Sequence, residues 1–129
     1  SSMLAYQAAG IDKSRAVRLD PAQGLVEVMG VSIPENAERI YGPLFDAIEA
    51  YALAPAERTT IRISLSYFNS SSAKFILDTL KRLDDLHATG PSKVLLAWLH
   101  APGDLHLIEA GRDYKSLIEF PVRLVETDY

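Results

Sequence analysis

A run of hydroxyl side chains in the middle of the chain carries the first chemistry that the sequence suggests. Asn69 is followed by Ser70, Ser71 and Ser72, and Lys74 comes shortly after them. The run lies between a predicted strand and a predicted helix, and the free N–H groups of a helix start favour an anion. A phosphoryl group on one of these serines would be stabilised there, with Lys74 adding positive charge. The same residues also suit an ordinary helix cap, so both interpretations stay open.

Two other groupings of reactive side chains are weaker candidates. His100, His106 and Glu109 are metal-ligand types, but a Pro-Gly loop separates the histidines and their spacing matches no ligand motif. Ser70, His100 and Asp104 supply the residue types of a hydrolytic triad, without the Gly-x-Ser-x-Gly turn that exposes such a nucleophile. The sequence therefore predicts no metal, no cofactor and no catalytic site.

A second polar segment precedes the first predicted helix. Ser32 suits the N-cap of that helix, Pro34 its first turn and Glu35 its positive end. Capping accounts for Ser32 and Glu35 but does not require Asn36. Because this loop could lie near Ser70 in the predicted sheet, Ser32, Glu35 and Asn36 are candidates for a partner-binding or kinase-recognition surface.

The elements that must position these residues follow from the spacing of apolar side chains. Alternation or a short continuous apolar run indicates a strand, and recurrence every three or four residues indicates a helix. The predicted strands are 15–20, 25–29, 61–68, 94–99 and 120–125, and the predicted helices are 37–51, 71–87 and 104–117. Turn residues at 21–24 predict a hairpin, and the helical crossovers predict parallel pairing after it. The result is a single α/β domain, a mixed β-sheet flanked by helices in the order β-β-α-β-α-β-α-β.

Some details of this scheme are specific enough to check. Pro43 is expected to kink the first helix or divide it. The apolar run 94–99 predicts a strand buried on both faces, near the centre of the sheet. Asp84 and Asp85 are expected on a solvated helix face. Residues 1–12 carry weak signals and are expected to form a loose N-terminal segment.

Composition narrows the classes of function. The chain has 129 residues, of which 48% are hydrophobic and 23% charged, as expected for one globular domain. It has no cysteine, and its net charge of −4 and scattered basic residues argue against nucleic acid as a partner. No apolar run approaches the ~20 residues of a membrane span, so no membrane insertion is expected and the predicted location is the cytoplasm.

Four segments resemble, in order, motifs of the SiaC-like regulatory phosphoproteins. They are residues 30–37 (GVSIPENA), residues 67–72 (YFNSSS), Trp98, and residues 109–114 (EAGRDY). The resemblance spans about residues 15–125. It implies a STAS-like fold, similar to anti-sigma-factor antagonists.

The resemblance also implies a mechanism. In such a family a Ser/Thr protein kinase phosphorylates the residue after the motif asparagine, and a PP2C-type phosphatase reverses the reaction. The unphosphorylated protein binds and activates a diguanylate cyclase, which raises cyclic-di-GMP and promotes biofilm formation. Here the modified residue would be Ser70. Together with the two polar segments described above, this gives as candidate partner-binding residues Ser32, Glu35, Asn36, Asn69, Ser71, Ser72 and Lys74. The family has an acidic run just before the EAG motif, where this chain has APGDLH at residues 101–106. This departure affects which diguanylate cyclase would be the partner.

Two other functions stay open from the residues alone. One is a small-molecule-binding module or an enzyme that uses a groove near Ser32, Asn36 and Asn69. The other is a structural subunit of an oligomer, which would need a large apolar interface.

Overall fold

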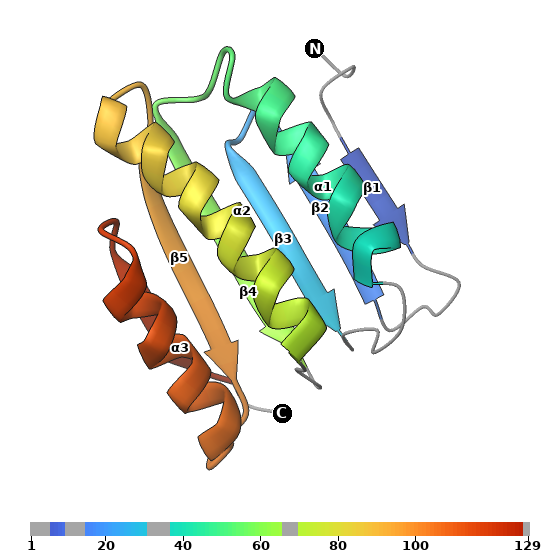
Figure 1. The fold of residues 1–129 in the computed structure, drawn as a ribbon, viewed down its shortest axis with the longest axis vertical. Coiled ribbons are helices and arrows are strands. Elements are labelled where there is room, and N and C mark those ends of the chain that lie inside the picture. Colours follow the sequence, from blue (N-terminus) through green and yellow to red (C-terminus); the bar gives the residue numbers. More distant parts are fainter. Residues whose placement is uncertain (1–5, 10–14, 31–36, 66–69, 128–129) are drawn as a thin grey trace.

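Nine secondary-structure elements follow one another in the computed structural model, which describes residues 6–9, 15–30, 37–65 and 70–127 (Figure 1). The strands are β1 (Tyr6–Ala9), β2 (Arg15–Asp20), β3 (Leu25–Gly30), β4 (Arg58–Leu65), β5 (Lys93–His100) and β6 (Val122–Glu126). The helices are α1 (Ala37–Tyr51), α2 (Ser70–Thr89) and α3 (Leu105–Leu117). The predicted order is confirmed, with one strand added in front.

The added strand is β1, within the segment that was expected to be loose. Its four residues have no strong pattern of their own, but they pair antiparallel with β2, from Tyr6 opposite Leu19 to Ala9 opposite Ala16. Pairing with a neighbour supplies the order that the local sequence lacks. The expectation of a wholly loose N-terminal segment was therefore wrong for these residues.

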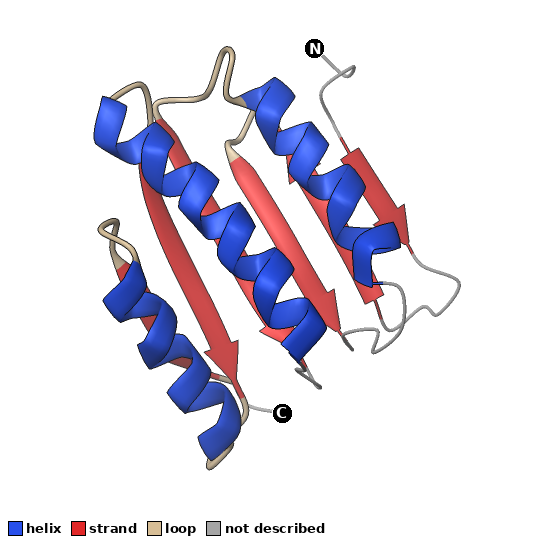
Figure 2. Ribbon diagram, in the orientation of Figure 1, coloured by secondary structure: helices blue, strands red, loops and turns tan. Residues whose placement is uncertain are grey.

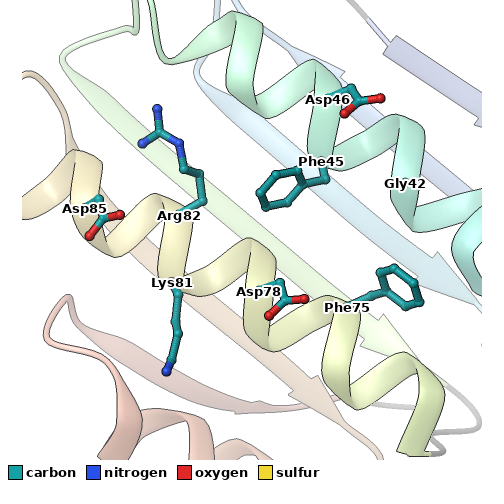
Figure 3. Close-up of a pocket in the computed structure, with 8 residues that line it drawn as sticks. All are labelled: Gly42, Phe45, Asp46, Phe75, Asp78, Lys81, Arg82 and Asp85. Atoms are coloured by element: carbon teal, nitrogen blue, oxygen red, sulfur yellow. The ribbon is translucent and has the colours of Figure 1, made fainter.

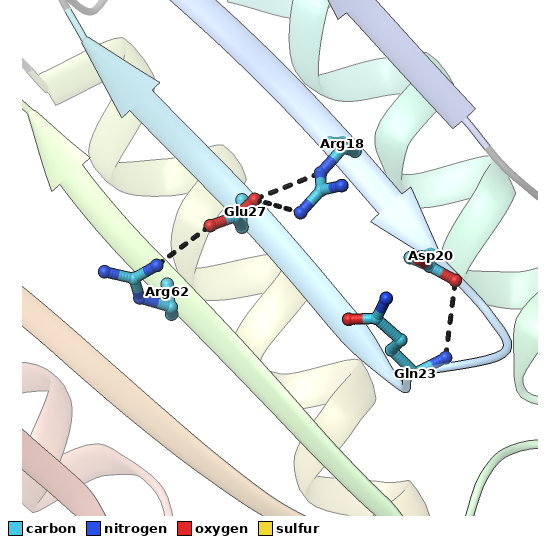
Figure 4. Close-up of polar contacts among 5 residues, drawn as sticks. All are labelled: Arg18, Asp20, Gln23, Glu27 and Arg62. Carbon is cyan, nitrogen blue, oxygen red and sulfur yellow. Dashed lines mark hydrogen bonds and ion pairs between the residues drawn. The ribbon is translucent and has the colours of Figure 1, made fainter.

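The six strands form one mixed sheet in the order β1-β2-β3-β4-β5-β6. β2 and β3 form the predicted hairpin. The turn is held by Asp20 Oδ1, which accepts a hydrogen bond from the Ala22 N–H and another from the Gln23 N–H, the second of which is drawn in Figure 4. β3, β4, β5 and β6 are parallel. Because each crossover advances the sheet in the same direction with the same hand, α1, α2 and α3 all lie on one side of it (Figures 1 and 2).

The hydrophobic core lies between the sheet and that helical layer. In register across the sheet, Val26, Ile61 and Leu96 are fully buried. The helices add mainly aliphatic side chains, namely Leu44, Ile48, Tyr51, Ile76, Leu80, Leu83, Leu107 and Tyr114. No helix in the described ranges is both long and apolar enough to span a membrane.

The opposite face of the sheet has no helix over it in the described residues, which corrects the prediction for β5. Val94, Leu96 and Trp98 are buried under the helices, whereas Leu95 and Ala97 are only partly buried. Leu99 is the one residue of that second face of β5 that is buried. The continuous apolar run therefore marks a strand next to the edge strand β6, not near the centre of the sheet, and only partly covered on its second face.

A row of charges crosses this open face on neighbouring strands. Arg18, Glu27 and Arg62 are opposite one another in β2, β3 and β4 (Figure 4). Arg18 Nη2 lies 2.6 Å from Glu27 Oε1, and Arg62 Nη1 lies 3.0 Å from Glu27 Oε2. One carboxylate thus balances two guanidinium groups.

The first helix continues through Pro43, so of the two expected outcomes, a kink or a division, the division does not occur. Pro43 is exposed inside α1, while Leu44, Ile48 and Tyr51 on the inner face are almost completely buried. The packing of this face offsets the backbone hydrogen bond that proline cannot make.

Candidate functional site

One end of the sheet gathers the carboxyl ends of the parallel strands and the starts of the helices (Figure 1). Gly30 at the end of β3 is opposite Leu65 at the end of β4, and Ser64 is opposite Leu99 of β5. In open α/β sheets this end is the usual place for ligands and partners. Segments 31–36 and 66–69, which carry several predicted site residues, lie outside the described residues and are bounded here by Gly30 and Leu65.

Ser70 is the first residue of α2 and its side chain is exposed. The first turn of this helix contains no acidic residue, and the exposed Lys74 follows Ser70 by four positions, on the same helix face. The prediction that the serine run begins a helix, with Ser70 accessible, is confirmed. The positive end of α2 thus has no carboxylate of its own in its first turn, and an added anion would be favoured there.

The other predicted site residues have different outcomes. Ser72 is fully buried, so its predicted direct contact with a partner was wrong: the helix turns its side chain toward the core. Lys74 is exposed as predicted. Ser71 belongs to the first turn of α2. The remaining predicted residues lie outside the described part of the chain: Ser32, Glu35, Asn36 and Asn69.

The start of α2 is held in place from α3, a feature that sequence reasoning missed. The Tyr114 hydroxyl donates to the Ala73 carbonyl at 2.9 Å, and the Tyr114 ring lies 5.3 Å from that of Trp98. Trp98 Nε1 donates to the Leu107 carbonyl at 2.8 Å. A Cβ on Gly111 would lie 2.6 Å from Trp98, so only glycine lets α3 approach the indole this closely. Trp98 and the motif at 109–114 therefore fix α3 against the first turn of α2.

A groove runs along one side of α2, between α2 and α1 (Figure 3). Its volume is about 570 Å³, and the half-buried Phe45 and Phe75 project into the space between the helices. Phe75 is thus less buried than its place on the apolar stripe suggests. The rest of the lining is mainly charged: Gly42, Asp46, Asp78, Lys81, Arg82 and Asp85.

A smaller groove of about 290 Å³ lies on the other side, between α2 and α3. It is lined by Ala73, Lys74, Leu77, Ala110, Asp113 and Tyr114. The groove between α2 and α3 therefore borders the first half of α2, and the groove between α1 and α2 runs along residues 75–85; both have apolar floors and charged rims. A surface of this composition suits contact with another protein.

Two residues of the groupings considered for catalysis or metal binding, Asp104 and His100, have structural partners. Asp104 caps α3 by accepting from the Leu107 N–H at 3.1 Å, and His100 Nδ1 lies 3.0 Å from the carbonyl of the next residue. The Ser-His-Asp grouping is therefore not assembled as a triad. His106 and Glu109 are exposed on α3. Within ranges 6–9, 15–30, 37–65 and 70–127, no three metal-ligand side chains of these types come together.

These features define a small α/β domain that presents an exposed serine at the start of a helix flanked by two grooves. The family model described as SiaC family regulatory phosphoprotein matches residues 8–127. The chain therefore belongs to the SiaC family of regulatory phosphoproteins.

Relatives agree with this assignment over nearly the whole chain. An uncharacterized protein of Pseudomonas aeruginosa (strain UCBPP-PA14) is 25% identical over 119 residues, covering 92% of this chain and 94% of the relative. A chain in the crystal structure of the diguanylate cyclase SiaD in complex with its activator SiaC, from Pseudomonas aeruginosa, superimposes with a TM-score of 0.85 at 24% identity, covering 95% and 99% of the two chains. A structure of SiaC from Pseudomonas aeruginosa superimposes with a TM-score of 0.83 at 24% identity, covering 95% of this chain and 98% of the SiaC chain. The fold is that of these structures.

Proposed function

We propose that this protein is a binding switch that activates a diguanylate cyclase when Ser70 is unmodified and releases it when Ser70 is phosphorylated. The observation that carries the proposal is the exposed Ser70 at a helix start, in a member of a regulatory phosphoprotein family. The fold likeness to a SiaC chain described as the activator of SiaD supports the choice of partner class. Because a diguanylate cyclase and a protein kinase would both draw on cytoplasmic nucleotides, we propose that the interaction occurs in the cytoplasm.

The chemistry of the switch is reversible transfer of one phosphoryl group. A Ser/Thr protein kinase moves the γ-phosphoryl group of ATP to Ser70 Oγ, and a PP2C-type phosphatase hydrolyses the ester. The phosphate brings nearly two negative charges and three acceptor oxygens. The N–H groups of the first turn of α2 and the Lys74 ammonium can hold it without unfolding the helix.

The effect on binding is electrostatic. A partner that covers the start of α2 and its two grooves must desolvate Ser70. A dianion at that position leaves a buried charge or a like-charge contact, which costs several kcal/mol and lowers affinity roughly 100-fold or more. The protein acts by contact and not by catalysis. The candidate small-molecule groove depends on Ser32, Asn36 and Asn69, which lie outside the described residues.

The experiment is affinity capture from cells of the source organism with tagged variants of the full chain. We expect Ser70→Ala to retain a diguanylate cyclase, identified by mass spectrometry, and to increase its formation of cyclic-di-GMP. Ser70→Asp should retain much less, because its carboxylate carries part of the charge of a phosphate.

The matched control is Thr89→Asp, which adds the same charge at the exposed far end of α2, about 30 Å away. It should capture the cyclase as well as wild type does. Equal capture by Ser70→Ala and Ser70→Asp, or the absence of any cyclase, would contradict the proposal.

A further inference from the structure

The outer edge of β6 has backbone groups without a partner strand in the described part of the chain. In the described sheet β6 pairs with β5 alone. The Pro121 carbonyl accepts from Leu96 N–H at 3.0 Å, and Thr127 N–H donates to the His100 carbonyl at 2.8 Å, so residues 121 and 127 face β5. Because successive residues of a strand direct their backbone groups to opposite sides, every second residue between them faces outward. The outward groups belong to Val122, Leu124 and Glu126.

A groove of about 720 Å³ runs beside that edge, between β6 and α3, and is called the β6 groove here. Arg112 and Lys115 of α3 and Arg123 of β6 line it, with Glu126 as the acidic residue of the lining. All four side chains are exposed. Three cations and one carboxylate leave a net charge of +2, in a chain whose total is −4.

The three cations of the β6 groove have no ion pair within the described ranges. The ion pairs found there use Arg18, Arg62 and Arg82. Asp113, the neighbour of Arg112 in the chain, lines the groove on the other side of α3. The positive charge of the β6 groove is thus available to an outside ligand.

The cations border both sides of the space that an added strand would occupy. Arg123 and Val125 project from the open face, because Leu124 between them packs toward the core. Alternate side chains of an added strand would lie beside Arg112 and Lys115 on the helix side, and beside Arg123 on the open side. Carboxylates on either face would meet a cation, and Val125, 39% exposed, offers an apolar contact.

We propose that the β6 groove binds a short, extended, acidic segment of a partner protein, which pairs with β6 as an additional strand. Main-chain hydrogen bonds to the three outward residues would supply affinity, and the cations would select acidic side chains. A second copy of the chain is a poor occupant through the same edge, because pairing two β6 edges would bring two sets of three cations together. This proposal does not depend on phosphorylation of Ser70.

The test uses a fluorescent peptide of about six residues, long enough to cover β6, in which glutamate and valine alternate. We expect saturable binding to the full chain at low ionic strength, weakened by added salt. Amide hydrogen exchange should slow at Val122, Leu124 and Glu126 on binding, with little change at Arg123 and Val125, which already face β5. Unchanged exchange at the outward amides would overturn the proposal.

Variants and a modified peptide separate strand pairing from simple charge attraction. Arg112→Ala and Arg123→Ala should each weaken binding roughly two- to fivefold. Lys81→Ala, which removes an exposed lysine of α2 outside the β6 groove, should not. The same acidic peptide with alternate backbone nitrogens methylated keeps its charge but cannot pair, and should not bind. Equal binding of the methylated and unmethylated peptides would refute the proposal. So would slow hydrogen exchange at the outward amides in the absence of peptide, caused by self-association of the protein.

Discussion

The Tyr114 hydroxyl donates a hydrogen bond of 2.9 Å to the carbonyl of Ala73, and so joins α3 to the first turn of α2. Ala73 lies three residues after Ser70. The Tyr114 ring in turn packs beside Trp98, and the backbone of Gly111 packs closely against the same indole. The helix start that presents the modifiable serine is therefore fixed by a set of contacts from β5 and α3.

Replacing Tyr114 by Phe tests this connection. The variant keeps the ring beside Trp98 but loses the hydrogen bond, which should lower the free energy of unfolding by about 0.5–1.5 kcal/mol. The loss should be local, so amide exchange at residues 74–77, whose N–H groups bond to the carbonyls of the first turn of α2, should become faster than the global change explains. Urea denaturation and hydrogen exchange measure the two effects.

Tyr51→Phe is the matched control at the other end of the domain. The Tyr51 hydroxyl lies in a buried network with Thr59 Oγ1 at 2.8 Å and accepts from the Ala56 N–H at 3.1 Å. Its loss should cost about 1–3 kcal/mol without a selective effect on α2. If both variants accelerate exchange at the start of α2 to the same degree, Tyr114 does not hold that turn in place.

Gly111→Ala should destabilise the protein despite alanine's higher helix propensity. The added Cβ would lie 2.6 Å from Trp98 Cδ1, and overpacking a buried contact costs about 1–3 kcal/mol, against a gain of about 1 kcal/mol from propensity. Ser116→Ala, at an exposed position of the same helix, lacks this clash and serves as the control in urea denaturation. A Gly111→Ala variant as stable as wild type would mean that α3 can shift away from Trp98 freely.

Glu27→Gln should lower the free energy of unfolding by about 1 kcal/mol at low salt. The substitution removes the carboxylate that Arg18 and Arg62 share. The Glu27 side chain is only 17% exposed, so water screens these ion pairs less than it would at the surface. Added salt should reduce the difference from wild type. The Glu49 side chain is 45% exposed, and within the described residues its carboxylate pairs with a single arginine, Arg82. Glu49→Gln should therefore lower the free energy of unfolding by less. Equal losses would show that sharing between two arginines adds no stability.

Local pattern predicted most of the fold because it has a direct physical cause. The alternation of Ile61, Ile63 and Leu65 reflects the burial of one face of β4, and the helical spacing after Ser70 reflects the burial of one face of α2. Ser70 was located at a helix start for the same reason. Its exposure and position could therefore be predicted from the sequence.

The features that were missed depend on contacts between residues distant in the chain. β1 is ordered by its neighbour β2, and the Tyr114–Ala73 bond joins residues 41 positions apart. Asp84, expected on a solvated face, accepts from the N–H groups of Glu119 and Phe120 at the turn into β6. No local pattern of charge or hydropathy signals such partners. One sequence feature could have indicated the contact between α3 and β5: a glycine and a tyrosine three residues apart on a predicted helix, in a chain with a single tryptophan on the preceding strand.

The proposed switch depends on the charge at Ser70. The decisive measurement is a calorimetric titration of the cyclase retained by Ser70→Ala, using unmodified, Ser70→Ala, Ser70→Asp and fully phosphorylated protein, with thermal melts in parallel. We predict that unmodified and Ser70→Ala proteins bind alike, that Ser70→Asp binds more weakly, and that phosphorylated protein binds roughly 100-fold more weakly or worse. The melting temperature of Ser70→Asp should be unchanged or slightly higher, because an acid at the start of α2 is favoured. If all four forms bind alike, or if Ser70→Asp loses binding only because it unfolds, Ser70 is a helix residue and not a switch.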